Sequence, residues 1–390
     1  METITAPAYK ADGVNLGEGD SFSKFCGDIC RESYENSPYL KVRDWSRGQF
    51  RGPRTFRLKK VSAECALSLD PDGNGTKVII TSIADTPEYS GNDLFAMTGM
   101  DGVRYGGRNV VLVNQLDCSS IGVSGDATNR FFRRMITGLG EIAKNQNVVL
   151  LKGETAEMGI CVGSENQNAV AKYLWCGVML SVFHPDVFIT GAGLNSGQIA
   201  VALREHGLRA NGGSSARKAF AMRYGKDWYS NPAAQDDIKV AAAPSKLYEN
   251  FLSSVNGWTS LDEQGKPCPR MRIHAIAHIT GGGIPSKFFE DILKPRGFSA
   301  ELDNLWDPPE IMQKFAKWRG VSGKEPYDIW HGGSGAIVVL DEENVSDFCS
   351  YANVFGHEAM PAGLIVETSA SGVPTLTITS KFDGGKLVWN

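Results

Sequence analysis

The sequence predicts an α+β protein made of layered sheets and helices, and three observations support this. The chain has 390 residues, which is enough for two domains with sizeable cores. Short apolar runs of strand length recur along it, and stretches with apolar residues at helical spacing lie between them. Because some of the runs are too continuous for a half-exposed strand, we expect layered α+β domains.

The expected strands are the short apolar runs, which are rich in β-branched and aromatic residues. They comprise residues 77–83, 109–113, 147–153, 173–183, 198–203, 336–341 and 375–380. One more strand is expected to end near His278.

Three stretches are expected to be helical. Residues 129–145 place Phe132 and Ile136 on one side of a helix. The other two are 244–255, which opens on Pro-Ser, and 343–355.

A boundary between two domains is expected near 183–197, where a strand gives way to a glycine-rich turn. It divides the chain into an N-terminal domain, 1–186, and a C-terminal domain, 187–390. Two polar segments in the second half, 223–240 and 256–271, are interpreted as surface insertions.

The composition excludes several classes of protein. The formal net charge of −4 gives no global reason to expect a nucleic-acid partner, and no apolar run is long enough to cross a bilayer. The first residues lack the pattern of a secretory signal. Of the eight cysteines only Cys26 and Cys30 are close in sequence, and no second pair completes a zinc site. We therefore expect a cytoplasmic protein with no membrane or nucleic-acid partner.

The stretch "LDPDGNGTK" (69–77) suits a nucleotide phosphate bound with Mg²⁺. Glycine leaves backbone N–H groups open, Thr76 donates a hydrogen bond, Lys77 supplies a charge, and Asp72 can hold a cation. Taken alone, a turn that feeds a strand explains it as well or better.

Further carboxylates stand at two other places. Asp93 and Asp101 bracket a run of helical character, which would bring them to roughly one face about two turns apart. Glu154 follows the apolar run of 147–153, where an acidic residue next to glycine suits a metal or a substrate. Helix caps and first-turn residues explain both patterns equally simply.

Two glycine-containing loops precede expected helices. Asn211, Gly212 and Ser214 stand where open amides would bind an anion, although simple capping by serine has equal weight. In "AHITGGGIP" (277–285), His278 and Thr280 precede three glycines, and Pro285 is expected to begin a helix.

Residues 41–60 hold eight basic residues and one acidic residue, with aromatic residues among them. Such a segment can bind single-stranded nucleic acid. We favour a mobile, solvated loop, or a loop that binds a phosphorylated small molecule.

The order and spacing of these stretches resemble aminoimidazole ribonucleotide synthetase, also called phosphoribosylformylglycinamidine cyclo-ligase. The matching pieces are "AYKADGVNLGEGD", "DGNGTK", "NDLFAM", "GETAEM", "GLRANGGSSARK", "APSKLY", "AHITGGGIP" and "WHGGSGAIVV". They extend from about residue 8 to about residue 365.

This resemblance implies two α+β domains and a homodimer joined largely through strands of the N-terminal domain. It also implies ATP and Mg²⁺ as cofactors. The amide oxygen of formylglycinamidine ribonucleotide would be phosphorylated, an amidine nitrogen would attack that carbon, and phosphate would leave as the imidazole ring closes.

The resemblance also assigns roles to residues. It places Asp72, Asp101 and Glu154 in the metal shell, with Asp93 as a weaker candidate. The residues expected at the ATP and ribonucleotide phosphates are Lys10, Gly75, Thr76, Lys77, Asn211, Gly212, Ser214, Gly281 and Gly282. The residues expected to take part in the reaction are His278, Thr280 and Lys10, with His278 as donor to the phosphorylated oxygen or as the group that moves a proton.

Several positions depart from the family pattern. They are Pro71, where the family has threonine; Met100 and His331, where it has asparagine; Arg209, where it has histidine; and Asn114, where it has aspartate. A glycine-rich segment of the family is replaced by the basic residues of 41–60. These departures leave a second reading open: a paralogous ATP-dependent enzyme that activates a different amide or carbonyl. A non-enzymatic binding protein is a third reading, which retention of the carboxylates disfavours.

Overall fold

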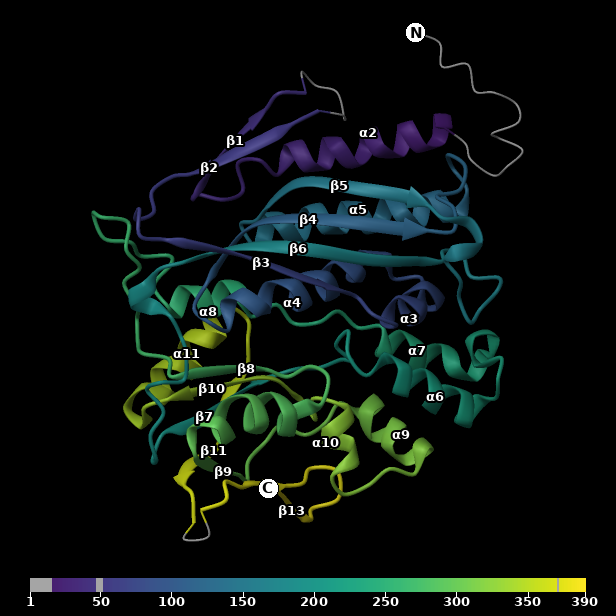
Figure 1. The fold of residues 1–390 in the computed structure, drawn as a ribbon. Helices are drawn as coiled ribbons and strands as arrows, with labels where there is room; N and C mark the ends of the chain where they lie inside the picture. The colour runs from purple at the N-terminus through teal and green to yellow at the C-terminus, as the bar shows by residue number, and fades with distance from the viewer. Residues whose placement is uncertain (1–15, 47–51, 370–371) are drawn as a thin grey trace.

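The computed structural model describes residues 16–46, 52–369 and 372–390. Within these ranges the chain forms a four-stranded sheet, a seven-stranded sheet and a small two-stranded hairpin (Figure 1). The chain passes from the first large sheet to the second between Phe183 and Ile199. The domain boundary at 186/187 lies in that passage and stays a prediction.

The four-stranded sheet has the order β3-β6-β4-β5, and only β4 and β5 run parallel. Its strands are β3 (Ala66–Gly73), β4 (Arg108–Cys118), β5 (Val149–Glu157) and β6 (Tyr173–Phe183). The helices of this part are α2 (Leu16–Glu32), α4 (Ser90–Val103) and α5 (Ala127–Asn145).

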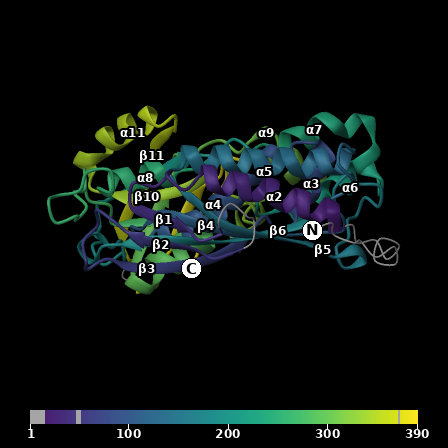
Figure 2. The same cartoon turned by 90° about the horizontal axis from the view of Figure 1, so that it is seen from above.

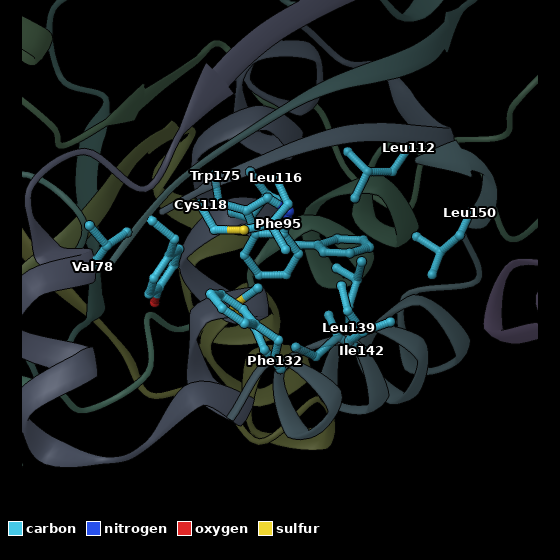
Figure 3. Close-up of a cluster of buried hydrophobic side chains, with 14 of the residues drawn as sticks. Val78, Phe95, Leu112, Leu116, Cys118, Phe132, Leu139, Ile142, Leu150 and Trp175 are labelled. Carbon is cyan, nitrogen blue, oxygen red and sulfur yellow. The ribbon is translucent and has the colours of Figure 1, made fainter. Parts of the chain in front are cut away.

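One face of this sheet is covered by helices, and the other is covered only in part, under the β1–β2 hairpin. Helices α4 and α5 pack on one side, where Phe95, Phe132 and Trp175 belong to a continuous apolar core (Figures 2 and 3). On the other side Leu67 and Leu69 of β3 are more than half exposed. The sheet therefore presents apolar side chains outward.

The basic segment at 41–60 contributes a hairpin, which corrects the expectation of a mobile loop for its described part. Strand β1 (Leu40–Asp44) pairs antiparallel with β2 (Arg54–Leu58). Alternate residues on each strand are half-buried, including Val42 and Phe56, which pack against the core under the hairpin. This burial orders a segment whose charge pattern alone predicts a loop.

The seven-stranded sheet contains strands that are buried on both faces, β8 and β10 among them. Its order is β13-β12-β9-β11-β7-β10-β8. The strands are β7 (Ile199–Arg204), β8 (Ala275–His278), β9 (Phe298–Leu302), β10 (Ser334–Leu340), β11 (Ala359–Glu367), β12 (Leu376–Thr379) and β13 (Lys386–Trp389). Alternate residues of β10 enter two different cores, with Ile337 in one and Val338 in the other.

Helices of the second half cover this sheet and, together with α3 from the first half, form a cluster beside it. On the sheet lie α8 (Glu249–Val255), the π-helix η6 (Pro285–Leu293), α10 (Glu325–Ile329) and α11 (Val345–Val354). The cluster consists of α3 (Lys77–Ala84), α6 (Gly213–Tyr224), α7 (Gln235–Ala241) and α9 (Glu310–Arg319). Single turns of 3-10 helix connect these elements at 87–89, 159–161, 185–187, 228–230, 232–234, 294–296 and 342–344. Among the described helices none has the length and apolar character needed to span a membrane.

Two sequence-based assignments are wrong. Residues 77–83 form the helix α3 instead of a strand, because this short apolar run is buried on several sides among α6, α7 and β6. Helix α8 begins at Glu249 instead of 244, because the N–H and the hydroxyl of Ser245 bond to Asp93 and hold the preceding segment out of the helix. The other expected strands and helices are present, with ends shifted by a few residues.

Candidate active site

Three loops that were predicted to bind phosphate lie together in the structure. The hydroxyl groups of Thr76 and Ser214 are 3.1 Å apart and share a hydrogen bond. A Cβ atom on Gly75 would lie 3.7 Å from the carbonyl oxygen of Ala210, and one on Gly281 would lie 3.9 Å from Nδ2 of Asn211. Segments from three distant parts of the chain therefore meet at one place.

Each of these loops ends at the start of a helix that has no side-chain cap. Thr76, Gly212 and Ile284 occupy the cap positions of α3, α6 and η6, and none of them makes a side-chain cap hydrogen bond. Pro285 begins η6, as predicted. Uncapped N–H groups at a helix start attract anions. The convergence suits a polyanion such as a nucleotide phosphate chain.

The three consecutive glycines differ in what surrounds them. Gly282 and Gly283 have φ angles of 85° and 62°, and a Cβ on Gly283 would collide with the carbonyl oxygen of Tyr327. Gly281 has only Nδ2 of Asn211 within 4 Å of such an atom. Packing and turn geometry thus explain Gly282 and Gly283, whereas Gly281 lies beside open space.

His278 ends strand β8 and is 2% exposed. Its Nε2 lies 2.9 Å from Nη2 of Arg209. Burial lowers the pKa of His278 well below its ordinary value, and the nearby cations Arg209, Arg104 and Lys287 lower it further. The imidazole is therefore neutral and suits hydrogen-bond donation. Thr280, two residues on, is half-buried, and its carbonyl accepts the N–H of Gly283 at 2.9 Å.

A carboxylate cluster lies at the edge of the first sheet, where Asp70 and Asp72 of β3 approach Asp101 of α4. Asp72 accepts its neighbour's N–H (Gly73) at 2.7 Å, and one oxygen of Asp70 is buried with no hydrogen-bond partner among the described residues. Burial raises the pKa of Asp101; Arg104 opposes this, and Asp72 and Asp70 raise it further. The cluster carries excess negative charge that a cation would neutralise.

The cluster fits Mg²⁺ in the way that nucleotide enzymes hold it. Within the described ranges no three acidic, histidine or cysteine side chains are arranged as a complete metal cage. Mg²⁺ usually takes one or two carboxylates together with waters and phosphate oxygens. Asp72 and Asp101 meet that requirement, and the unpartnered oxygen of Asp70 lies beside them.

Two cations connect the carboxylate cluster with His278. Arg104 lines a hollow of about 370 Å³ beside Asp70 and Asp101, and also a smaller cavity of about 80 Å³ together with Lys287. Both cations act on the pKa values of Asp101 and His278. Arg104 therefore lies between the acidic cluster and a second, more cationic cavity.

Four other predicted site residues are not found in the carboxylate cluster. The side chain of Lys77 is fully buried and its Nζ bonds to Asp93 at 2.8 Å, so these two side chains contact each other and not the cluster. Glu154 on β5 is exposed and three strands away from Asp72, about 14 Å at ordinary strand spacing. Lys10 lies outside the described residues. The roles of all four stay predictions.

Two departures from the family pattern are buried and bonded to the protein. Arg209 is 1% exposed and donates to Glu205 at 2.7 Å. His331 lies 2.8 Å from the carbonyl of Gly207 and accepts the N–H of Gly333, and burial lowers its pKa to about 4. Neither side chain is free to bind a substrate anion in this arrangement.

The remaining departures lie apart from this pair. Pro71 is exposed on β3, Met100 is buried in α4, and Asn114 accepts the indole N–H of Trp175 at 3.0 Å.

Reasoning from the sequence missed Asp70, Arg104, Lys287 and Glu205 as parts of the site. The spacing of Asp70 and Asp72 was a usable signal, since residues two apart on a strand face the same side. The other three are placed by tertiary contacts that no local pattern reports.

The sequence of the chain is similar to those of known enzymes. The family described as "AIR synthase related protein, N-terminal domain" matches residues 57–179. Phosphoribosylformylglycinamidine cyclo-ligase of Caldicellulosiruptor bescii is 26% identical over 340 residues, covering 86% of this chain and 90% of that protein. The enzyme of the same name from Thermodesulfovibrio yellowstonii is 26% identical, covering 95% and 98%. Residues 57–179 of the chain thus match the AIR synthase-related family, and the cyclo-ligases resemble the chain over most of its length. This confirms the resemblance and the prediction that the chain is an enzyme.

Solved structures agree on the fold. The hydrogenase maturation protein HypE of E. coli has a TM-score of 0.55 at 12% identity, covering 94% of this chain and 96% of its own. Thiamine-monophosphate kinase of Stenotrophomonas maltophilia has a TM-score of 0.56 at 12% identity, covering 92% and 95%. A HypE structure solved in complex with ATP has a TM-score of 0.53 at 15% identity, covering 86% and 87%. These likenesses confirm the α+β fold and show nothing of the reaction.

Proposed function

We propose that this protein closes the imidazole ring of aminoimidazole ribonucleotide, using ATP to activate formylglycinamidine ribonucleotide and releasing ADP and phosphate in purine biosynthesis. The observation that carries the proposal is the meeting of three uncapped helix starts, one of them shortly after His278, in a protein that also brings the carboxylates of Asp72 and Asp101 together. Curated cyclo-ligases that match over most of the chain support the same reading.

The residues have separable tasks in this proposal. The loops at Thr76, Ser214 and Gly281 bind phosphate oxygens through backbone N–H groups and hydroxyls. Mg²⁺, held by Asp72 and Asp101, would neutralise charge on the transferred phosphoryl group. His278, neutral at physiological pH, donates a hydrogen bond to the amide oxygen that accepts the phosphoryl group.

We also propose a cytoplasmic homodimer joined through the open face of the four-stranded sheet. Leu67, Leu69 and Leu174 are each more than half exposed there, and apolar side chains on an otherwise open sheet favour burial against a second copy. Sedimentation of wild type and L69E tests this: we expect a dimer and a weakened dimer. A monomeric wild type would contradict it.

Turnover with defined substrates tests the reaction. We expect release of ADP and phosphate from ATP only when formylglycinamidine ribonucleotide is present, together with formation of aminoimidazole ribonucleotide. A protein that binds Mg–ATP and never turns over that substrate would exclude this function.

A second candidate is an enzyme of the same superfamily that activates another amide or carbonyl. The cations Arg104 and Lys287, beside His278, favour it because they provide a second anion-binding feature in the hollow. A panel of amide-bearing ribonucleotides and carboxylates distinguishes the two, since only one class should stimulate hydrolysis of ATP.

A further inference from the structure

A chain of three buried polar side chains lies behind the proposed site. Glu205 follows β7, Arg209 precedes α6, and His278 ends β8. Nη1 of Arg209 donates to Oε2 of Glu205 at 2.7 Å, and Nη2 of Arg209 lies 2.9 Å from Nε2 of His278. None of the three is more than 2% exposed. The contacts therefore belong to the protein interior and are not screened by solvent.

The chemistry of arginine decides which atom is the donor in the contact between Arg209 and His278. A guanidinium carries only N–H donors and stays charged, so Nε2 of His278 must accept. The proton of the neutral ring is then on Nδ1. Arg104 on α4 and Lys287 on η6 also face this ring and disfavour a second proton on it. One neutral tautomer satisfies all these neighbours.

Arg209 is fully engaged by the protein on its two terminal nitrogens. Besides Glu205 and His278, it donates to the carbonyl of Lys246 at 3.1 Å, and its guanidinium lies over the ring of Tyr248. Its Nε–H is buried without a partner among the described residues. Glu205 in turn accepts the N–H of Lys246 at 3.1 Å and that of His206 at 3.0 Å, so the carboxylate cannot turn away from Arg209 without losing these bonds as well.

We propose that Arg209, held in place by Glu205, is a positioning residue that keeps His278 in the tautomer with its proton on Nδ1. The use of that N–H as a donor to substrate rests on the proposed function; the tautomer itself does not. In this arrangement the arginine acts through the histidine and does not contact the substrate, which accounts for its presence in a fully buried position.

The tautomer can be read directly from ring nitrogen resonances. Protein labelled with ¹⁵N-histidine is examined by two-bond ¹H–¹⁵N correlation near neutral pH, and H278N assigns the signals of His278 among the six histidines. We expect a single neutral form protonated on Nδ1. A ring protonated on Nε2, or a mixture in the wild type, would overturn the proposal.

Two variants test the dependence on Arg209. The pair E205Q/R209M removes both charges together, which buried ion pairs tolerate better than loss of one partner. R209K keeps the charge with one ammonium group, which cannot reproduce both bonds of the two-armed guanidinium. In each we expect the form protonated on Nε2 to appear. Retention of the Nδ1 form alone in both variants would contradict the proposal.

A matched control removes another ion pair from the same strand end. Arg204 and Glu358 are 2.7 Å apart and partly exposed, and R204M/E358Q is expected to leave the signals of His278 unchanged. In the activity assay we expect E205Q/R209M to lower kcat about 10- to 100-fold with the KM for ATP unchanged. The spectra are recorded without substrate, so a wild type that shows the Nδ1 form and no cyclo-ligase activity would sink the proposed function alone.

Discussion

Two regions of the molecule treat their carboxylates in opposite ways. On the side of β3 and α4, Asp70, Asp72 and Asp101 crowd together, and Arg104, 3.5 Å from Asp101, and Lys287 offset their charge only in part. On the side of β7 and β8, Glu205 is fully paired with Arg209. An uncompensated cluster suits binding of a cation from solution, whereas a compensated carboxylate suits holding neighbours in place. The difference separates residues that meet ligands from residues that position them.

The largest expected effect tests the buried pair of Lys77 and Asp93. K77M leaves the carboxylate of Asp93 buried without its cation and should lower the free energy of unfolding by about 3–5 kcal/mol. Urea unfolding measures it. K314M, at a partly exposed pair, should cost less than about 1 kcal/mol. If K77M keeps its stability and instead loses ATP binding, Lys77 belongs with the ligand contacts that the sequence predicts.

The next effect tests the acidic side. D72N and D101N should each lower kcat at least about 100-fold, equivalent to about 3 kcal/mol, because the cation loses a ligand. The free energy of unfolding should not fall, since removing a charge from the crowded cluster relieves repulsion. The turnover assay measures kcat, isothermal titration measures binding of Mg–ATP, and urea unfolding measures the free energy of unfolding. The variant E263Q, at an exposed position, is the control. Activity near the wild-type level in both variants would remove the metal assignment. E154Q, measured alongside, reports whether Glu154 acts with them.

A third test concerns Glu249, a buried carboxyl group whose charge Arg209 offsets only in part. It is 2% exposed, both oxygens lack partners among the described residues, and burial raises its pKa from 4.5 to about 7. The unfolded chain releases this proton near pH 4.5 and the folded chain near pH 7. The contribution of Glu249 to stability therefore falls as pH rises between those values and is constant above them.

Removing the charge should reverse that loss. E249Q should exceed wild type in unfolding free energy by about 2–3 kcal/mol at pH 8 and match it near pH 4.5. Urea unfolding at several pH values gives the difference, and E263Q should show no such dependence. A difference in unfolding free energy that does not change with pH would mean that burial does not raise the pKa of Glu249.

The smallest effect tests the phosphate-binding loops. S214A removes the exposed hydrogen bond to Thr76 and should change unfolding free energy by less than about 1 kcal/mol. The KM for ATP should rise about 3- to 10-fold, because one hydroxyl is lost where the loops meet. S230A, which removes a similar exposed hydroxyl contact elsewhere, is the control. Equal KM values in the two variants would place the nucleotide away from Ser214.

Several features could be read from the sequence because they depend on local pattern. The strand that ends at His278 and the helix that begins at Pro285 follow from an apolar run and from the fixed φ of proline. The loops at Thr76, Asn211 and Gly281 could be predicted because glycine and small polar residues leave their backbone N–H groups open to a ligand. Their meeting in space could not be read, since it depends on how two sheets pack.

Other features depend on partners that sequence does not reveal. Residues 77–83 have the composition of a strand. They form a helix because they are buried among neighbouring helices. The charge of Arg209 suggests a substrate contact, but in the structure this charge is paired with the buried carboxylate of Glu205. The pairing of Lys77 with Asp93 likewise links two residues that local motifs assign to ATP and to metal.

The three glycines before Pro285 differ in how strongly the surrounding chain requires glycine. Alanine at 283 would break the fold through Tyr327, and alanine at 282 would strain a turn, so both must persist in any descendant that still folds. Position 281 faces no such demand from its own chain. A substitution at 281 therefore tests the ligand alone, whereas one at 282 or 283 also tests the fold.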